Sequence, residues 1–261
     1  MATSYTFGGT ALTTYGKVTL INDDFDFPET RGENIIIQFQ HGETFVRKYF
    51  GSRKIIFGIV MTAATAGAME TLVDNLKAKL APRTQQTLAQ TREDSTVRNI
   101  SATVDASIEP DRFTDKVTRA VLTFSCTSPF WRLSTAIADN TTTIDASPHA
   151  MVVTNPGTVE ERNPTITLTG PLTNPVITNS TNGVVLTYTS AIAGGDTVTI
   201  YQKADGEYTA IHSVSGEVIG NVTHSGSTAL MVIDVGTNNL SIASDVITTG
   251  TVKVSFYAPF L

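Results

Sequence analysis

Apolar and polar residues alternate along most of the chain, and this period of two predicts β-strands. In the first part, the runs richest in β-branched residues are Lys17–Ile21, Asn34–Gln40 and Lys54–Met61. Strict alternation returns at Ile100–Ile108 and again at Ala120–Cys126, with the connection EPDRFTDK before the second run. We therefore expect these last two runs to form a long antiparallel hairpin.

The period changes once, over Ala66–Leu80, where apolar side chains fall on one helical stripe. Thr65 is placed to cap the start of a helix, and Pro82 follows within two residues of its end. The chain thus predicts one helix among strands. The stripe consists of Met69, Leu72, Val73, Leu76 and Leu80.

From Met151 onward, short strand-like runs recur about every ten residues and are separated by turn residues, which indicates an all-β sandwich. Asp205-Gly206 is a candidate hairpin turn. Residues 134–150 carry little large apolar material and are typical of an edge segment or a linker. We predict a first domain at 1–133, a linker at 134–150 and a second domain at 151–261. The runs are TITLTG, VVLTYT, DTVTIY, YTAIHSV, ALMVIDV and TVKVSFY.

Composition and charge narrow the class of protein. Of the 261 residues, 41% are hydrophobic and 16% charged, a mixture that suits strands and turns. The net charge of −6 makes binding to the phosphates of nucleic acid unfavourable. Residues 1–149 carry 15 basic and 16 acidic side chains and residues 150–261 carry 3 and 8, which supports two domains. We expect no secretory signal and no membrane insertion, because neither a basic, apolar leader nor a long apolar run is present.

Motifs for chemistry are missing from the sequence. It holds no nucleophile elbow, Walker loop, dinucleotide fingerprint or His-Glu-x-x-His. The four histidines are scattered, and a pair formed by His212 and His224 is better explained as two surface side chains. Asp23, Asp24 and Asp26 resemble the start of a calcium loop, but the glycine and closing glutamate are missing, which favours a solvated turn. We expect no enzyme activity, metal or cofactor; a carboxylate pair for glycoside hydrolysis is the weak alternative.

The single cysteine and the single tryptophan stand five residues apart in LTFSCTSPFWR. Cys126 shares a strand face with Leu122 and Phe124, which predicts an inert core thiol and not a nucleophile. Trp131 follows the last strand of the first domain. We interpret it as an anchor at the domain junction, since a large rigid side chain buries much surface; an exposed sugar-stacking role is the alternative.

Several short phrases resemble the phage distal tail protein family. YTFGGTALTTYGKV is similar to its opening phrase, and TFSCTSPFWR to the end of its first domain, although Ser128 replaces a common acidic residue. VTNPGTVEERNPTITLTG and GDTVTIYQKADGEYTAI are similar to the entry into its second domain. The resemblance spans nearly the whole chain in the expected order.

This resemblance implies a fold and a role. The fold is mainly β, with a tail-tube-like N-terminal β-sandwich flanked by one helix and a C-terminal β-sandwich like a galectin or carbohydrate module. The role is a homo-hexameric ring in the virion, at the distal end of a long non-contractile tail. The ring joins the tail-tube protein to the tip hub protein and to receptor-binding proteins. DNA passes through its channel without specific binding, and the chain is made in the host cytoplasm. The alternatives are a carbohydrate-binding module and a tail-tube subunit.

We expect subunit contacts in the first domain, where an acidic segment at 22–33 and a basic, aromatic segment at 44–54 carry opposite charge. Packing of these aromatic residues in the domain's own core is an equal alternative. In the second domain Phe256 and Tyr257 are consecutive, so one of them faces the core and the other is exposed. The candidate interface residues are Asp23, Asp24, Asp26, Phe45, Arg47, Tyr49 and Phe50.

Overall fold

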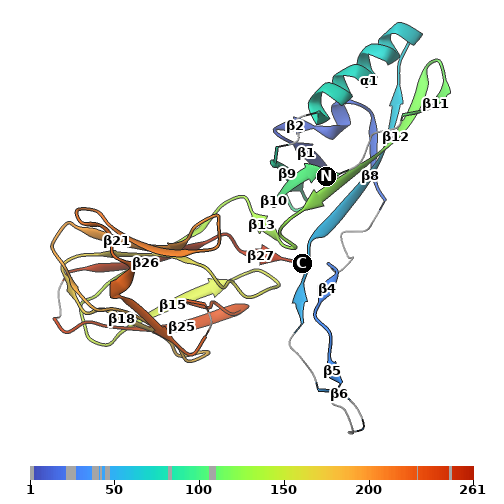
Figure 1. Cartoon of the computed structure of the whole chain (residues 1–261). Helices are drawn as coiled ribbons and strands as arrows, with labels where there is room; N and C mark the ends of the chain where they lie inside the picture. The colour runs from blue at the N-terminus through green and yellow to red at the C-terminus, as the bar shows by residue number, and fades with distance from the viewer. Residues whose placement is uncertain are drawn as a thin grey trace. The chain divides into compact units, whose positions relative to one another are not determined.

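The computed structural model describes residues 3–21, 28–36, 41, 43–44, 48–81, 84–105, 110–227, 229–246 and 249–261. The chain divides into two compact units (Figure 1). The first contains residues 1–132 with Leu261, and the second contains residues 133–260. Both are built almost wholly from antiparallel strands, which confirms the mainly β fold predicted from the alternating pattern.

The main sheet of the first unit has the strand order β2-β1-β9-β10-β12-β8-β3. β11 pairs with β12, and β13 pairs with β10. Its strands are β1 (Ser4–Phe7), β2 (Thr10–Ala11), β3 (Lys17–Leu20), β8 (Arg53–Thr62), β9 (Gln86–Thr91), β10 (Val97–Val104), β11 (Asp111–Thr114), β12 (Val117–Cys126) and β13 (Trp131–Leu133), with a 3₁₀ turn at Leu12–Thr14.

This sheet curls over on itself to form a sandwich-like core. β1 is three pairing steps from β12, which is about 14 Å in a flat sheet. The ring centroids of Phe7 in β1 and Phe124 in β12 are nevertheless 4.8 Å apart. Tyr5 and Phe57 likewise meet at 4.7 Å, although β1 and β8 are four steps apart. The first strand therefore packs face to face against the centre of its own sheet.

The predicted helix is confirmed as α1 (Ala66–Leu80). The hydroxyl of Thr65 accepts a hydrogen bond from the backbone N–H of Ala68 at 3.2 Å, which is the predicted N-cap. Met69, Leu76 and Leu80 of the predicted stripe are buried. Pro82, expected to end the helix, lies outside the described residues. The apolar spacing therefore identified both the helix and the face that it buries.

The predicted hairpin is present in the pairing of β10 with β12. Ala102 lies opposite Cys126, and Val104 lies opposite Phe124. Part of the expected connection forms a further strand, β11, whose register against β12 shifts between Arg112 and Thr114. Phe113 is therefore the additional residue of a β-bulge.

Two further strand pairs in the first unit lie outside the main sheet. β4 pairs with β7, and β5 pairs with β6. Figure 1 shows β4, β5 and β6 following one another away from the main sheet. Of the predicted strand Asn34–Gln40, the described part contains β5, and residues 37–40 lie outside the description. The bounds are β4 (Thr30–Arg31), β5 (Ile35–Ile36), β6 (Glu43–Thr44) and β7 (Tyr49–Phe50).

The second unit is a sandwich of two antiparallel sheets (Figure 1). The orders are β14-β26-β16-β21-β22-β23 and β15-β25-β18-β19-β24, and β17 pairs with β20. Alternate residues of these strands are buried between the sheets. The strands are β14 (Ile137–Thr143), β15 (His149–Asn155), β16 (Thr165–Thr169), β17 (Leu172–Thr173), β18 (Val176–Asn179), β19 (Val184–Tyr188), β20 (Ala191–Ile192), β21 (Thr197–Gln202), β22 (Tyr208–His212), β23 (Gly216–Glu217), β24 (Val222–Ser225), β25 (Gly236–Ala243), β26 (Thr251–Phe256) and β27 (Pro259–Phe260), with a 3₁₀ turn at Ile219–Asn221.

The second unit confirms one prediction from the sequence and differs from two others. The turn at Asp205-Gly206 joins the antiparallel strands β21 and β22, as predicted. Residues 134–150 were interpreted as an edge segment or a linker and were assigned as the linker; they contain β14, the edge strand of the six-stranded sheet, so the edge-segment alternative is the correct one. The run ALMVIDV was expected to be a strand, but within it only Ile233 forms a single bridge, to Glu161. Both differences arise because the composition of a short segment does not show which strand it pairs with.

Candidate assembly surface

The predicted interface residues are only partly described. Asp23, Asp24, Asp26, Phe45 and Arg47 lie outside the described residues. Tyr49 and Phe50 form β7, opposite Arg31 and Thr30 of β4.

Tyr49 is 56% exposed. Phe50 is half-buried and its ring meets that of Phe130 edge-on, with centroids 5.9 Å apart. Of these two neighbouring aromatic residues, Tyr49 is therefore directed to solvent, and Phe50 packs partly within its own unit.

Trp131 is 2% exposed and begins β13, one residue before the first unit ends at Arg132. A side chain buried to this degree has no face on which a sugar ring can stack. The position agrees with the interpretation of Trp131 as an anchor at the junction, which stays a prediction.

One face of the first unit's sheet exposes apolar side chains. On β12, Ala120, Leu122 and Phe124 point into the core, and Arg119 and Val121 point to the opposite face. Val121 is 52% exposed and lies opposite Gly58 of β8.

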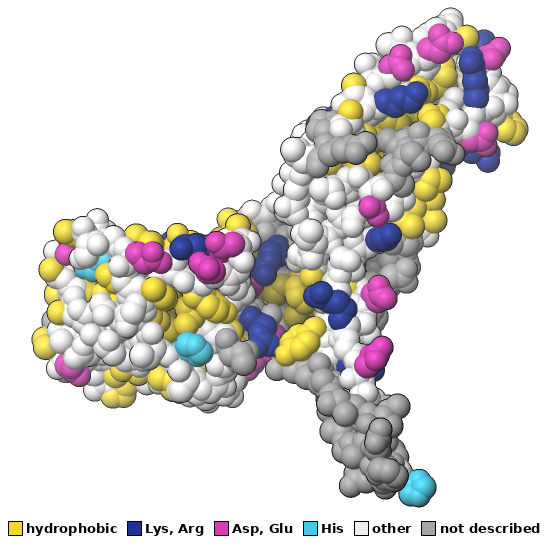
Figure 2. Space-filling model, in the orientation of Figure 1, with side chains coloured by type: hydrophobic (Ala, Val, Ile, Leu, Met, Phe, Trp, Pro, Cys, Tyr) yellow, Lys and Arg dark blue, Asp and Glu magenta, His cyan; other side chains and the backbone are white. Residues whose placement is uncertain are grey.

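Gly58 is covered by Ile21, which follows β3 and is 56% exposed: a Cβ at Gly58 would lie 3.4 Å from the Cδ1 of Ile21. Phe113, at the β11 edge, is 68% exposed. We call Phe113, Val121 and Ile21 the apolar row. Figure 2 shows exposed hydrophobic side chains on the first unit among basic and acidic ones.

Phe113 is held in its exposed position by its neighbours. The guanidinium carbon of Arg119 lies 5.4 Å from the centre of the Phe113 ring, a cation–π contact. The adjacent Arg112 reaches Asp115 at 3.2 Å and Glu70 of α1 at 3.9 Å. The bulge and these contacts tie the β11 hairpin to β12 and to α1. Such an aromatic side chain loses little freedom when a partner covers it. The sequence did not indicate this exposed side chain, because DRFT was interpreted as part of a connection.

The thiol of Cys126 is fully buried, and burial raises its pKa to about 12. The prediction that Cys126 is an inert core thiol is therefore confirmed, since a nucleophilic cysteine needs a lowered pKa.

Among exposed groups, the backbone N–H of Thr96 lowers the pKa of Asp94, an ordinary turn contact. No group of three or more metal-ligating side chains occurs within the described parts of the chain.

Two histidines make specific contacts that sequence spacing did not reveal. His149 Nδ1 lies 2.8 Å from an Asp145 carboxylate oxygen, and its Nε2 lies 2.7 Å from the Thr142 hydroxyl. A hydroxyl, an imidazole and a carboxylate in a chain resemble a hydrolytic triad. Here the three residues span from β14 to the start of β15, so they join edge strands of the two sheets.

His212 and His224, considered as a pair, lie on strands of different sheets. The Nδ1 of His212 accepts hydrogen bonds from the backbone N–H groups of Val214 and Ser215 at 3.1 and 3.3 Å. His212 is 8% exposed, so it is not the surface side chain that the sequence suggested. Its ring binds the backbone of the turn after β22, which makes it a structural residue of that turn.

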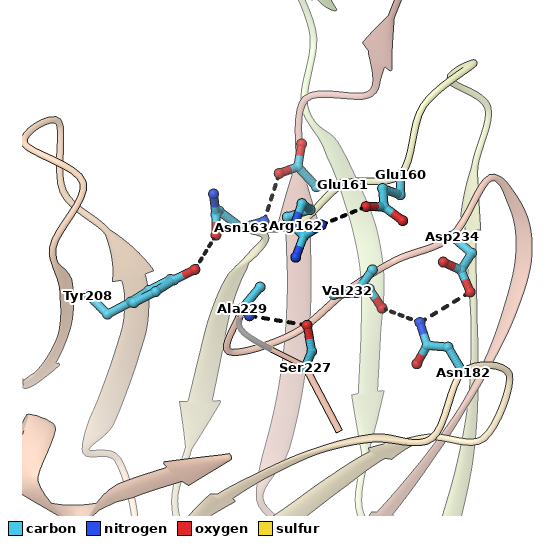
Figure 3. Close-up of polar contacts among 10 residues, drawn as sticks. All are labelled: Glu160, Glu161, Arg162, Asn163, Asn182, Tyr208, Ser227, Ala229, Val232 and Asp234. Carbon is cyan, nitrogen blue, oxygen red and sulfur yellow. Dashed lines mark hydrogen bonds and ion pairs between the residues drawn. The ribbon is translucent and has the colours of Figure 1, made fainter. Parts of the chain in front are cut away.

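A polar cluster in the second unit holds the non-strand run Ala229–Ile233, whose five residues are all buried. Figure 3 shows one part of it, in which the amide of Asn182 donates to the Val232 carbonyl at 3.1 Å. The amide of Asn179 donates to the Val232 carbonyl at 2.8 Å, and that of Asn155 donates to the Ile233 carbonyl at 3.3 Å. Glu161 exchanges two backbone hydrogen bonds with Ile233. Side-chain amides thus replace the strand neighbour that this buried backbone would otherwise need.

Tyr208 belongs to the same cluster (Figure 3). Its hydroxyl donates to the Asn163 side-chain oxygen at 2.6 Å and accepts from the backbone N–H of Leu230. Burial raises the pKa of this hydroxyl. Because the hydroxyl is engaged on both sides, Tyr208 positions the buried run.

The aromatic side chains of the second unit divide as the alternation predicts. Phe256 is 4% exposed and Tyr257 is 49% exposed.

The solvent face of the six-stranded sheet is lined by threonines in cross-strand rows. One row consists of Thr143, Thr251, Thr169 and Thr197. Threonine stabilises a solvated strand without charge. This row accounts for part of the low charge of the second unit.

None of the helices in the described part of the chain is long and apolar enough to cross a membrane.

Searches against family models and against curated proteins gave no match. Among solved structures, the chain resembles the Dit protein of phage SPP1, described as a paradigm of the hub adsorption apparatus in phages that infect Gram-positive bacteria. The TM-score is 0.71 at 12% identity, over 100% of both chains. The baseplate of phage P2 also matches over 100% of both chains, at a TM-score of 0.45 and 11% identity. The likeness to SPP1 Dit confirms, at the level of fold, the resemblance found in the sequence.

Proposed function

We propose that the chain is a structural protein of a phage virion, a distal tail protein whose copies form a ring of six at the end of a long non-contractile tail. The observation that carries this proposal is the match to SPP1 Dit, which extends through both units over 100% of each chain. The inert thiol of Cys126 and the structural contacts of His149 and His212 support a role in assembly and not in catalysis.

In this proposal the first unit forms the ring. Tyr49 and the charged segments 22–33 and 44–54 contribute contacts between neighbours. The ring joins the tail-tube protein to the tip hub protein, and receptor-binding proteins attach to it. Trp131 anchors the end of the first unit. The chain is made in the host cytoplasm and is carried in the tail tip.

The proposal is tested by measuring the mass of the purified chain by size exclusion with light scattering, and by negative-stain imaging. Six copies of the 27.9-kDa chain have a mass of six times that value, about 167 kDa. We expect that mass and ring-shaped particles, either from the chain alone or after addition of tip proteins from the same virion. A chain that stays monomeric and fails to join the tip under both conditions would contradict the proposal.

The channel of the ring is expected to pass DNA without holding it, because the first 149 residues carry 15 basic and 16 acidic side chains. A gel shift at micromolar protein and physiological salt should show no complex. A tail-tube subunit, the alternative role, would assemble into long tubes, which the same images would reveal.

A carbohydrate-binding role for the second unit rests on Tyr257, because its other aromatic side chains are buried or half-buried. We expect no tight sugar binding. Calorimetry of the full chain with common cell-wall glycans provides the test. A dissociation constant below roughly 100 μM, equivalent to about −5.5 kcal/mol, would support the carbohydrate role instead.

A further inference from the structure

One asparagine of the chain, Asn182, is followed by glycine. It lies in the turn between β18 and β19, where the backbone N–H of Gly183 donates to the Asn179 carbonyl at 2.7 Å. Gly183 has a φ of +76°, which glycine adopts without strain. An asparagine before a glycine is especially prone to deamidation, because the glycine has no side chain to shield its backbone nitrogen. The turn therefore carries a chemically reactive pair.

The side chain of Asn182 is held at both of its polar atoms (Figure 3). Its amide nitrogen donates to the Val232 carbonyl at 3.1 Å and to a carboxylate oxygen of Asp234 at 3.1 Å. Its amide oxygen accepts a hydrogen bond from the backbone N–H of Val184 at 3.2 Å. Because Val232 belongs to the buried run Ala229–Ile233, this amide ties the β18–β19 turn to that run.

These contacts oppose deamidation while the turn is closed. The reaction requires the Gly183 nitrogen to lose its proton and to reach Cγ of Asn182. In the closed turn that N–H is engaged with the Asn179 carbonyl, and hydrogen bonds fix the amide group of Asn182. The turn must therefore open first, and the rate of reaction follows the fraction of molecules in which it is open.

The chemistry in the open turn needs only water. The Gly183 nitrogen forms a bond to Cγ of Asn182, the bond from Cγ to Nδ2 breaks, and ammonia leaves. Water then opens the five-membered imide ring and gives aspartate or isoaspartate at this position, with no oxidation. Either product lacks the amide donors and places a second carboxylate beside that of Asp234. Like charges so close together repel each other.

We propose that Asn182 is a modification site gated by folding. It deamidates when the β18–β19 turn opens, and the new carboxylate, repelled by Asp234, then weakens the attachment of the turn to the buried run. Because the released ammonia is lost to the solvent, the change accumulates in chains that have spent time with the turn open. The modification does not depend on the role of the chain in a phage tail.

Peptide mapping by mass spectrometry measures the reaction. The full chain is kept in mildly alkaline buffer with and without urea, and fragmentation identifies which asparagine has become an acid. Asn182 should convert about tenfold faster or more in urea than in the native state. Equal rates under the two conditions would overturn the gating, and no conversion in urea would overturn the site.

Asn174 is the internal control for this measurement. Its amide also donates to a carboxylate, that of Asp245, at 2.7 Å. The next residue is Pro175, which has no backbone N–H and cannot supply the attacking nitrogen. Asn174 should therefore keep its amide under both conditions. Conversion of Asn174 in step with Asn182 would contradict attack by the Gly183 nitrogen.

The consequence of the modification is measured with variants of the full chain in differential scanning calorimetry. Asn182→Asp, which carries the charge of the product, should lower the melting temperature by about 3 °C or more. Adding Asp234→Asn to that variant should restore most of the loss, because it removes the repulsion and supplies an amide donor. Asn239→Asp, at an exposed position of β25, adds the same charge outside the turn and should have little effect. An Asn182→Asp variant that melts with the wild-type chain, or that Asp234→Asn does not rescue, would contradict the role of Asp234.

Discussion

The rings of Phe7 and Phe124 pack with centroids 4.8 Å apart, although their strands are three pairing steps apart in one sheet. Phe124 also contacts Phe57, with centroids 5.8 Å apart. This aromatic cluster is therefore where β1, near one end of the curled sheet, packs against the central strands β12 and β8. Its side chains join β1 to β12 and β8, to which β1 has no backbone hydrogen bonds, so they stabilise the first unit in addition to the strand pairing.

Phe124→Ala should destabilise the chain by about 3–5 kcal/mol, because it removes a fully buried ring and leaves a cavity. Urea unfolding followed by circular dichroism measures the change. Ser101→Ala, at an exposed position of the adjacent strand β10, is the control and should change the free energy of unfolding by about 0.5 kcal/mol or less. Equal effects of the two substitutions would show that the aromatic cluster is not part of the core.

Cys126 should make the stability of the chain fall at alkaline pH. Burial raises the pKa of its thiol from 9.0 to about 12, so the folded state disfavours the thiolate. The contribution is fully present below pH 9, the pKa when unfolded, and is lost as the pH rises toward 12. Comparison with Cys126→Ala isolates it: the stability of the wild-type chain should decline more steeply between pH 9 and pH 11. Parallel curves for the two proteins would contradict a buried, neutral thiol.

Asn179 should contribute strongly to the stability of the second unit. It is fully buried, and its amide donates both to the Val232 carbonyl and to the side-chain oxygen of Asn238 at 3.0 Å. Asn179→Asp removes those donors and buries a charge, and Asn179→Ala leaves the Val232 carbonyl with the amide of Asn182 as its remaining side-chain donor and removes the donor to Asn238. We expect a loss of about 2 kcal/mol or more from either substitution, measured by thermal unfolding. The matched control is Asn239→Ala, at an exposed position of β25, which should have little effect.

Much of the fold follows from the sequence, because strand and helix periods are local. The alternation around Leu122, Phe124 and Cys126 identified the core face of β12, and the spacing of Met69 and Leu76 identified the buried face of α1. The short sequence phrases that resemble the distal tail protein family agree with the likeness of the fold to SPP1 Dit. These inferences needed only neighbours in the chain and the size of their side chains.

The remaining features depend on residues that are distant in sequence. ALMVIDV has the composition of a buried strand, and its backbone is instead satisfied by Asn155 and Asn179, which no local pattern shows. Phe113 is exposed because a bulge inserts it between paired residues, and a connection with a bulge has no distinctive composition. His149 meets Asp145 and Thr142 because the chain turns between β14 and β15.

The boundary of the second unit can be tested with two fragments. A fragment of residues 133–261 retains β14, which pairs with β26, and Ile144, which is fully buried and donates its backbone N–H to the Gly250 carbonyl at 2.9 Å. A fragment of residues 151–261, which follows the boundary predicted from the sequence, lacks both. Burial of one isoleucine side chain alone contributes about 1.5–3 kcal/mol. The longer fragment should therefore unfold cooperatively, and the shorter one should melt at a clearly lower temperature in differential scanning calorimetry. Ile144→Ala in the longer fragment should lower the melting temperature part of the way, which separates the loss of packing from the loss of the strand. Equal melting temperatures for the two fragments would show that residues 134–150 act as the linker that the sequence predicts.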